Sequence, residues 1–267
     1  MLCNGQLNDE LIYTVKSLCL RCFHDKSENF PSGFLQRFIN LEYLKVSCSS
    51  FSEISLNGSI CAGHFETTMK LRRLVLAGLK NLEFICREKS VVQPVLQNIE
   101  ILEVHICSRL KNIFPSAMFF ENLEQLEVGD CAGLENVMKS STAISLQKLR
   151  KLWIYNCEKI EKIVASDDEN DAFEISFMKL EHLQLSNLPM LRSFSNGRHG
   201  FKFPQLQNLF VIDCPMMETF SHGVLNAPKL IEVHVKEQDE WHWNGDLNST
   251  IRKFIGKTVM FIQYLQP

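Results

Sequence analysis

The feature that most constrains the fold of this chain is a spaced set of apolar residues that recurs along it. In one unit the set falls on positions 0, 3, 5, 8, 11 and 14, which are Leu123, Leu126, Val128, Cys131, Leu134 and Val137. Five more units match at all six positions and begin at Leu71, Ile99, Leu149, Leu180 and Leu206. Weaker units begin at Val15, Leu41 and Leu230. Because self-similarity of this kind marks repeat architectures, the sequence predicts an array of stacked, structurally similar units.

The spacing of the units indicates their type. Unit starts near 15, 41, 71, 99, 123, 149, 180, 206 and 230 are separated by 24 to 31 residues, which is typical of leucine-rich repeats and too short for propeller blades or helical repeats. The apolar positions 3 and 5 point to one face of a short strand, and stacked units can bury side chains that a single unit cannot. We therefore predict an α/β solenoid, a leucine-rich-repeat horseshoe with a parallel β-sheet on the concave face and irregular or short-helical convex loops.

The array is expected to fill most of the chain. We predict a solenoid of about nine repeats over residues 1–240 and a C-terminal cap or tail over residues 241–267. An aromatic or aliphatic residue precedes many units by three positions and should form a phenylalanine-rich spine inside the solenoid: Phe38, Phe120, Leu146, Phe177 and Phe203.

Composition and the chain start indicate a soluble intracellular protein. The hydrophobic fraction of 45% is too high for disorder, and 28 basic against 31 acidic residues argue against nucleic-acid binding. The first residues lack the basic and apolar regions of a signal peptide, and the sequence contains no apolar stretch of about 20 residues that would span a membrane. We therefore expect a cytoplasmic location and interpret the glycosylation sequon Asn248-Ser249-Thr250 as a chance match.

The ten cysteines do not indicate a metal site or a disulfide framework. Four of them occupy position 8 of their units and should form a buried ladder: Cys107, Cys131, Cys157 and Cys214. Cys19-Leu-Arg-Cys22, followed by His24, resembles half of a zinc site, but no second pair with suitable spacing follows. The acidic run from Asp167 to Asp171 is interpreted as a solvated loop, with a partner-contacting loop as the alternative. Since no set of nucleophile, base and orienting residue is found, we expect no catalysis, no cofactor, no metal and no small-molecule substrate.

The residues between the buried strand positions should line the concave face. Taken together, these positions of three adjacent units hold aromatic residues beside polar ones, the usual composition of protein-interface hot spots. The candidate protein-binding residues are Lys151, Trp153, Tyr155, His182, Gln184, Phe210 and Ile212. The alternative is that Trp153 and Phe210 only cover one another or a neighbouring loop.

The repeats also resemble those of a known family. The string Leu/Ile-x-x-Leu-x-(Val/Ile/Leu)-x-x-Cys-x-x-(Leu/Ile) is similar to the C-terminal repeats of plant intracellular immune receptors, the CC-NB-LRR (NB-ARC) disease-resistance proteins. The segment Trp241-His-Trp243-Asn-Gly-Asp246-Leu-Asn-Ser-Thr250-Ile251 resembles the one that closes many of these arrays.

This resemblance implies a protein–protein interaction module of plant innate immunity. Its partner would be a pathogen effector, a guarded host protein or another receptor domain. The nucleotide-binding module and coiled coil of the family have no counterpart here, so the resemblance suggests a truncated product, a fragment or a repeat-only paralogue. Two alternatives stay open: a leucine-rich-repeat substrate adaptor of a ubiquitin ligase, which the proline-containing loops and missing F-box disfavour, and a non-functional receptor fragment.

Overall fold

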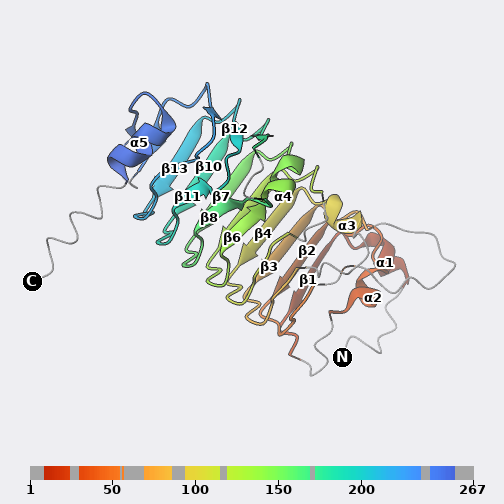
Figure 1. Ribbon diagram of the computed structural model, residues 1–267. Helices are drawn as coiled ribbons and strands as arrows, with labels where there is room; N and C mark the ends of the chain where they lie inside the picture. Colours follow the sequence, from red (N-terminus) through yellow and green to blue (C-terminus); the bar gives the residue numbers. More distant parts are fainter. Residues whose placement is uncertain are drawn as a thin grey trace, which may run out of the picture.

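The main element of the protein is a ten-stranded sheet that runs the length of a solenoid (Figure 1). The computed structural model describes residues 9–24, 30–54, 56, 69–85, 94–114, 119–168, 172–235 and 241–255. The parallel strands are β1 (Ser17–Arg21), β2 (Tyr43–Ser47), β3 (Arg73–Ala77), β4 (Ile101–His105), β5 (Gln125–Gly129), β7 (Lys151–Tyr155), β10 (His182–Ser186), β13 (Asn208–Ile212) and β15 (Val233–His234). Each begins two or three residues after one of the expected unit starts and pairs in register with the strand of the next unit. The predicted leucine-rich-repeat solenoid is confirmed.

The core follows from the two-residue alternation along each strand. In β5, Leu126 and Val128 are fully buried, whereas Gln125 and Glu127 are only partly covered and face outward. In-register pairing places Leu126 beside Leu102 of β4, and the same stacking repeats along the sheet. The buried positions of all units thus join into one continuous apolar core. The outward side of the main sheet is the concave face of the horseshoe.

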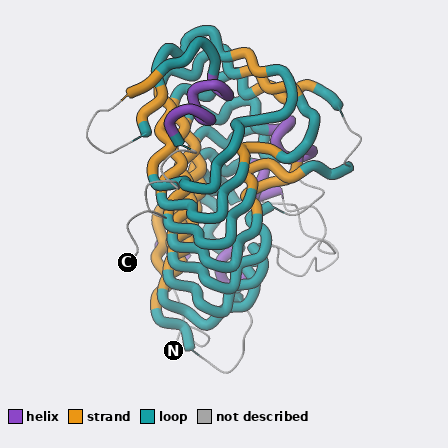
Figure 2. The backbone as a smooth tube through the Cα atoms, turned by 60° about the vertical axis from the view of Figure 1, so that its left-hand side comes forward, coloured by secondary structure: helices purple, strands orange, loops and turns teal. Residues whose placement is uncertain are grey.

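The return loops are more regular than the sequence led us to expect. Short helices occur there as predicted: α2 (Ser32–Leu35), α3 (Pro94–Gln97) and α4 (Ser140–Ser145). The structure differs in having two further three-stranded parallel sheets, one of β6 (Asn136–Lys139), β8 (Lys162–Ala165) and β11 (Ser193–Ser195), the other of β9 (Glu174–Ser176), β12 (Gly200–Lys202) and β14 (Leu225–Asn226) (Figure 2). Loops of neighbouring repeats run side by side, so their backbone groups pair across repeats rather than remaining unpaired.

Aromatic side chains fill the space between the sheets. All five residues of the expected spine are buried: Phe38, Phe120, Leu146, Phe177 and Phe203. The ring centroids of Phe177 and Phe203 lie 5.5 Å apart in a stacked arrangement, and those of Phe194 and Phe220 lie 4.6 Å apart. The predicted phenylalanine-rich spine is thus confirmed, and its rings are in mutual contact in the C-terminal half of the solenoid.

A left-handed residue follows the main strand in eight successive repeats. These residues, which we call the turn row, are Cys22, Cys48, Gly78, Ile106, Asp130, Asn156, Asn187 and Asp213. In the turn row, side chains of adjacent repeats can meet directly: Asn156 Nδ2 donates to Asp130 Oδ1 at 3.0 Å, and Asn187 Nδ2 donates to Asn156 Oδ1 at 2.9 Å. Glycine, asparagine and aspartate tolerate this conformation, but the β-branched Ile106 does so at a steric cost.

Different elements lie at the two ends of the array. The short helix α1 (Asp9–Thr14) is at the N-terminal end (Figure 1). At the other end, β16 (Trp241–His242) pairs antiparallel with β15, and α5 (Leu247–Phe254) begins after Asp246, whose side chain accepts a hydrogen bond from Ser249 N. Asn248 Oδ1 accepts from the backbone N–H groups of Phe220 at 2.8 Å and Ser221 at 3.3 Å. The sequon asparagine therefore holds α5 against the last full repeat.

Candidate protein-binding surface

The structure brings all seven candidate residues together on three adjacent strands, β7, β10 and β13. Parallel pairing in register arranges this part of the concave face in three rows: Lys151, His182 and Asn208; Trp153, Gln184 and Phe210; Tyr155, Ser186 and Ile212. We call these nine residues the strand patch. All nine are partly exposed. Asn208 and Ser186 complete the rows and belong to the patch by register, although they were not among the residues singled out from the sequence.

The two large apolar rings of the strand patch do not cover one another. Gln184 lies between Trp153 and Phe210 in the register, so the two residues are separated by two strand spacings, or about 10 Å. Lys151 Nζ lies 5.4 Å from the centre of the Trp153 ring, close enough for a cation–π interaction. Phe210 instead stacks on His234 of β15, with ring centroids 4.4 Å apart. Each ring is therefore supported by its own neighbour.

Tyr155 is held across the sheet toward the N-terminal repeats. Gly129, its partner in β5, has no side chain, and a Cβ there would lie 2.7 Å from the phenol oxygen. The hydroxyl donates to Glu127 Oε1 at 3.2 Å and lies 3.1 Å from His105 Nδ1. Partial burial and the charge of Glu127 raise the pKa of Tyr155, so the phenol remains a donor. Since its single hydrogen goes to Glu127, the hydrogen between Tyr155 and His105 must come from the imidazole.

The contacts of Tyr155 with Glu127 and His105 were not predicted from the sequence, although the sequence contains a pattern that indicates them. A glycine at an outward strand position next to a tyrosine at the same position of the following repeat leaves room for the ring to lie flat. In-register pairing converts that spacing of 26 residues into a direct contact between Gly129 and Tyr155.

Charge on the concave face changes along the solenoid. Glu103 of β4 and Glu127 of β5 are register neighbours, an arrangement of like charges that costs stability. Arg73 offsets this cost, because its guanidinium contacts Glu103 Oε1 at 2.6 Å. The face is therefore acidic over β4 and β5, and becomes basic and aromatic over β7, where Lys151 and Trp153 lie.

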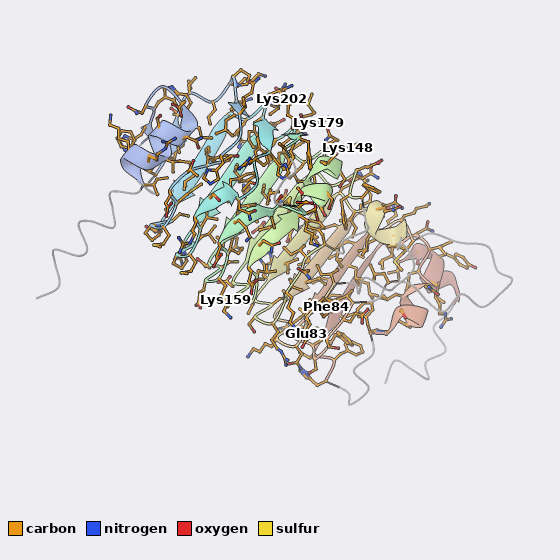
Figure 3. All side chains as sticks on the ribbon, in the orientation of Figure 1. Glu83, Phe84, Lys148, Lys159, Lys179 and Lys202 are labelled. Atoms are coloured by element: carbon orange, nitrogen blue, oxygen red, sulfur yellow. The ribbon has the colours of Figure 1, made fainter. Side chains whose placement is uncertain are left out.

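Ion pairs between repeats border the concave face at the edge where the strands begin. Arg72 pairs with Glu100 at 2.7 Å, and Arg150 pairs with Glu181 at 3.0 Å. Figure 3 shows Lys148 and Lys179 on this same edge and Lys159 on the opposite one. Such exposed pairs contribute little stability individually. The pair of Arg150 and Glu181 lies directly before β7 and β10 and so gives the strand patch a polar border, as is usual around the apolar centre of an interface.

The cysteine ladder is a structural feature of the core. Cys107, Cys131, Cys157 and Cys214 are all buried, as the sequence predicts, and their thiols are free. The Cys157 thiol donates to the carbonyl of Tyr155 at 3.2 Å, and burial raises the pKa of Cys157 to about 11 and that of Cys214 to about 12. The thiols of Cys157 and Cys214 therefore stay protonated at neutral pH and are poor nucleophiles. Over the described ranges, no three His, Cys, Asp or Glu side chains are grouped to hold a metal ion.

Within the acidic run, Asp167 has a structural role. Asp167 Oδ2 accepts hydrogen bonds from Ser141 N at 2.7 Å and Ser140 Oγ at 2.8 Å, so it caps α4 from the neighbouring repeat. Partial burial alone would raise the pKa of Asp167, but these hydrogen bonds outweigh it and the pKa lies below its ordinary value. Residues 169–171 lie outside the described residues. Asp167 and Asp168 are exposed, as expected of a solvated loop, and Asp167 in addition makes a specific contact between repeats.

The repeating strands, the shared core and the exposed patch define a leucine-rich-repeat solenoid, a class whose members typically serve as interaction modules. A family model described as plant disease resistance protein RPS2-like, leucine-rich repeats, matches residues 1–119 and 115–238. The chain belongs to this family of plant disease-resistance repeats. No individual curated protein matches it. None of the helices that the structure describes is both long and apolar enough to cross a membrane.

Proposed function

We propose that this chain is the recognition or regulatory repeat region of a cytoplasmic plant resistance receptor and binds a protein partner through the strand patch. The partner is a pathogen effector, a guarded host protein or another domain of the receptor. The observation that carries the proposal is the placement of Trp153 and Phe210, two large rings that stay partly exposed on a regular sheet where polar residues would suffice.

Contacts with neighbouring side chains hold several residues of the strand patch in place, which supports this proposal. Lys151 lies against Trp153, Asn208 Nδ2 lies 3.0 Å from His182 Nδ1, and Phe210 stacks on its neighbour. Ordering a mobile side chain at an interface costs about 0.5–1.5 kcal/mol, so groups held in place before binding lose less on association. Pre-organised aromatic anchors beside polar groups favour a protein surface as the ligand.

Proximity labelling in plant cells tests this proposal. The wild-type chain and a Trp153→Ala/Phe210→Ala variant are each fused to a labelling enzyme. We expect a specific protein set with the wild type and its loss with the double variant, because hot-spot truncations typically cost about 2 kcal/mol or more each. Ile144→Ala/Met190→Ala is a matched control, since both side chains are exposed apolar residues outside the strand patch.

The same experiment separates the alternatives. A labelled set shared equally by all three chains would contradict binding through the strand patch. Recovery of chaperones alone would favour a non-functional fragment, and enrichment of ubiquitin-ligase subunits would favour a substrate adaptor. The short strands in the return loops argue against the adaptor reading, because repeats of that kind usually carry a convex helix in each unit.

A further inference from the structure

Cys22 and Cys48 are neighbours in the turn row, although 25 residues separate them in the chain. Strands β1 and β2 pair in register up to Arg21 and Ser47, and Cys22 N donates to Ser47 O at 3.1 Å, which continues the ladder by one residue. Adjacent strands lie about 4.8 Å apart, and the Cα atoms of disulfide-bonded cysteines are about 4.4–6.8 Å apart. The backbone therefore sets the two cysteines at a spacing that a disulfide can bridge.

The side chains of these two residues are accessible to solvent. Both thiols are free and exposed, unlike the four buried thiols of the ladder. Contacts elsewhere in the turn row, such as that between Asn156 and Asp130 at 3.0 Å, show that side chains at this position reach across repeats. The Cys48 sulfur leans toward Gly78, 3.6 Å from the point where a Cβ would lie. A disulfide with Cys22 therefore requires this exposed sulfur to rotate about χ1 away from Gly78.

The cysteine pair that is close in the sequence is not the pair that is close in space. Cys19 lies within β1 and pairs in register with Lys45 on the concave face. The extended segment from Cys19 to Arg21 already spans about 6.6 Å, and Cys22 lies one residue beyond it. Cys19 and Cys22 are thus too far apart for a strain-free disulfide, whereas Cys22 and Cys48 are not.

We propose that Cys22 and Cys48 form a reversible disulfide site that links the first two repeats and takes low-molecular-weight disulfides such as oxidised glutathione as its oxidant. One cysteine thiolate attacks the glutathione disulfide, forms a mixed disulfide and releases one glutathione thiolate. The second cysteine thiolate attacks the protein sulfur of that bond and releases the other glutathione. Two protein thiols are oxidised and one glutathione disulfide is reduced to two thiols. Exposed disulfides are reduced more readily than buried structural ones, so a reducing compartment can return this pair to the thiol form.

Peptide mapping of the full chain after incubation with oxidised glutathione tests this assignment. After free thiols are alkylated, cleavage by trypsin and a glutamate-specific protease places Cys19, Cys22 and Cys48 on separate peptides, 17–21, 22–26 and 46–53. We expect peptides 22–26 and 46–53 to be joined, with a mass lower than their sum by two hydrogen atoms. Closing this loop should also raise the Tm by about 5–10 °C, an increase that dithiothreitol reverses.

Three variants keep the test decisive. Cys22→Ser and Cys48→Ser should each abolish the joined peptide and the reversible Tm increase, whereas Cys19→Ser should retain both. Mixed glutathione disulfides that persist on peptides 22–26 and 46–53 without a joined product would overturn the proposal. Linkage of either cysteine to Cys19 would overturn it as well.

Discussion

The phenol ring of Tyr155 occupies the space in which a side chain at residue 129 would lie. A Cβ on Gly129 would be 2.7 Å from the Tyr155 oxygen and would overlap the ring carbons. The hydroxyl reaches over this glycine to Glu127 and His105, so one side chain connects β4, β5 and β7 on the concave face. The flat position of Tyr155 shapes the N-terminal border of the strand patch.

Gly129→Ala should displace the Tyr155 ring and destabilise the protein. Overpacking of this kind costs about 1–3 kcal/mol, which equilibrium denaturation in urea measures. Gly33→Ala is the matched control, because a Cβ there meets no atom within 4 Å and the change should be within about 0.5 kcal/mol. Equal stability of the two variants would contradict the described position of Tyr155.

Ile106→Asn should stabilise the chain. Ile106 has φ 55°, and left-handed backbone costs about 1–2 kcal/mol for a residue of this shape, whereas asparagine tolerates it. The reciprocal change Asn156→Ile, at φ 53°, should destabilise by at least as much, because it also removes the hydrogen bond to Asp130. Thermal denaturation of the two variants checks this: a lower Tm for Ile106→Asn would show that the turn is not strained at that residue.

Asn248→Ala should loosen the C-terminal end of the array. The Asn248 amide accepts from Phe220 N and Ser221 N and donates to Ser221 O at 2.9 Å, and loss of partners for such groups costs about 1–3 kcal/mol. Hydrogen exchange at Phe220 and Ser221 should accelerate. Asn226→Ala, at an exposed position in β14, serves as the control and should leave this exchange unchanged. Unaltered protection of Phe220 and Ser221 from hydrogen exchange in the Asn248 variant would show that Asn248 does not hold α5 against the last full repeat.

Acid should weaken the contact between α4 and the next repeat. The pKa of folded Asp167 lies below the unfolded value of about 3.9, so its contribution is present above about pH 4 and is lost as the pH falls below that value. Asp167→Asn should cost about 1 kcal/mol at pH 7 and make stability less dependent on pH between about pH 5 and 3. Denaturation at several pH values measures this, and parallel curves for the two proteins would contradict it.

Much of the fold could be predicted because the repeat pattern indicates which residues lie on the same face of each strand. The spacing of Leu126 and Val128 alone implies a strand with one buried face, and recurrence implies in-register stacking. The small sheets in the return loops escaped prediction because backbone pairing there depends on the shape of neighbouring loops and not on side-chain alternation. Residues such as Asn248 and Asp167 bind backbone groups of other repeats, and that role leaves no periodic mark in the sequence.

The strand patch was predictable as a row of positions but not as a set of contacts. Alternation places Trp153, Tyr155 and Phe210 outward. Whether each ring is supported or free depends on its register neighbours, which include the residue without a side chain, Gly129, and the stacking partner His234. The cysteines illustrate the same limit, since the pair that matters spatially, Cys22 and Cys48, comes from two repeats.

The central claim, protein binding through the strand patch, is tested most directly by covalent footprinting of side chains with the partner that proximity labelling identifies. We predict that Trp153 and Phe210 lose most of their reactivity in the complex, while Ile144 and Met190, which are exposed outside the patch, react as before. Unchanged reactivity of Trp153 and Phe210, with protection at Ile144 or Met190 instead, would contradict the account.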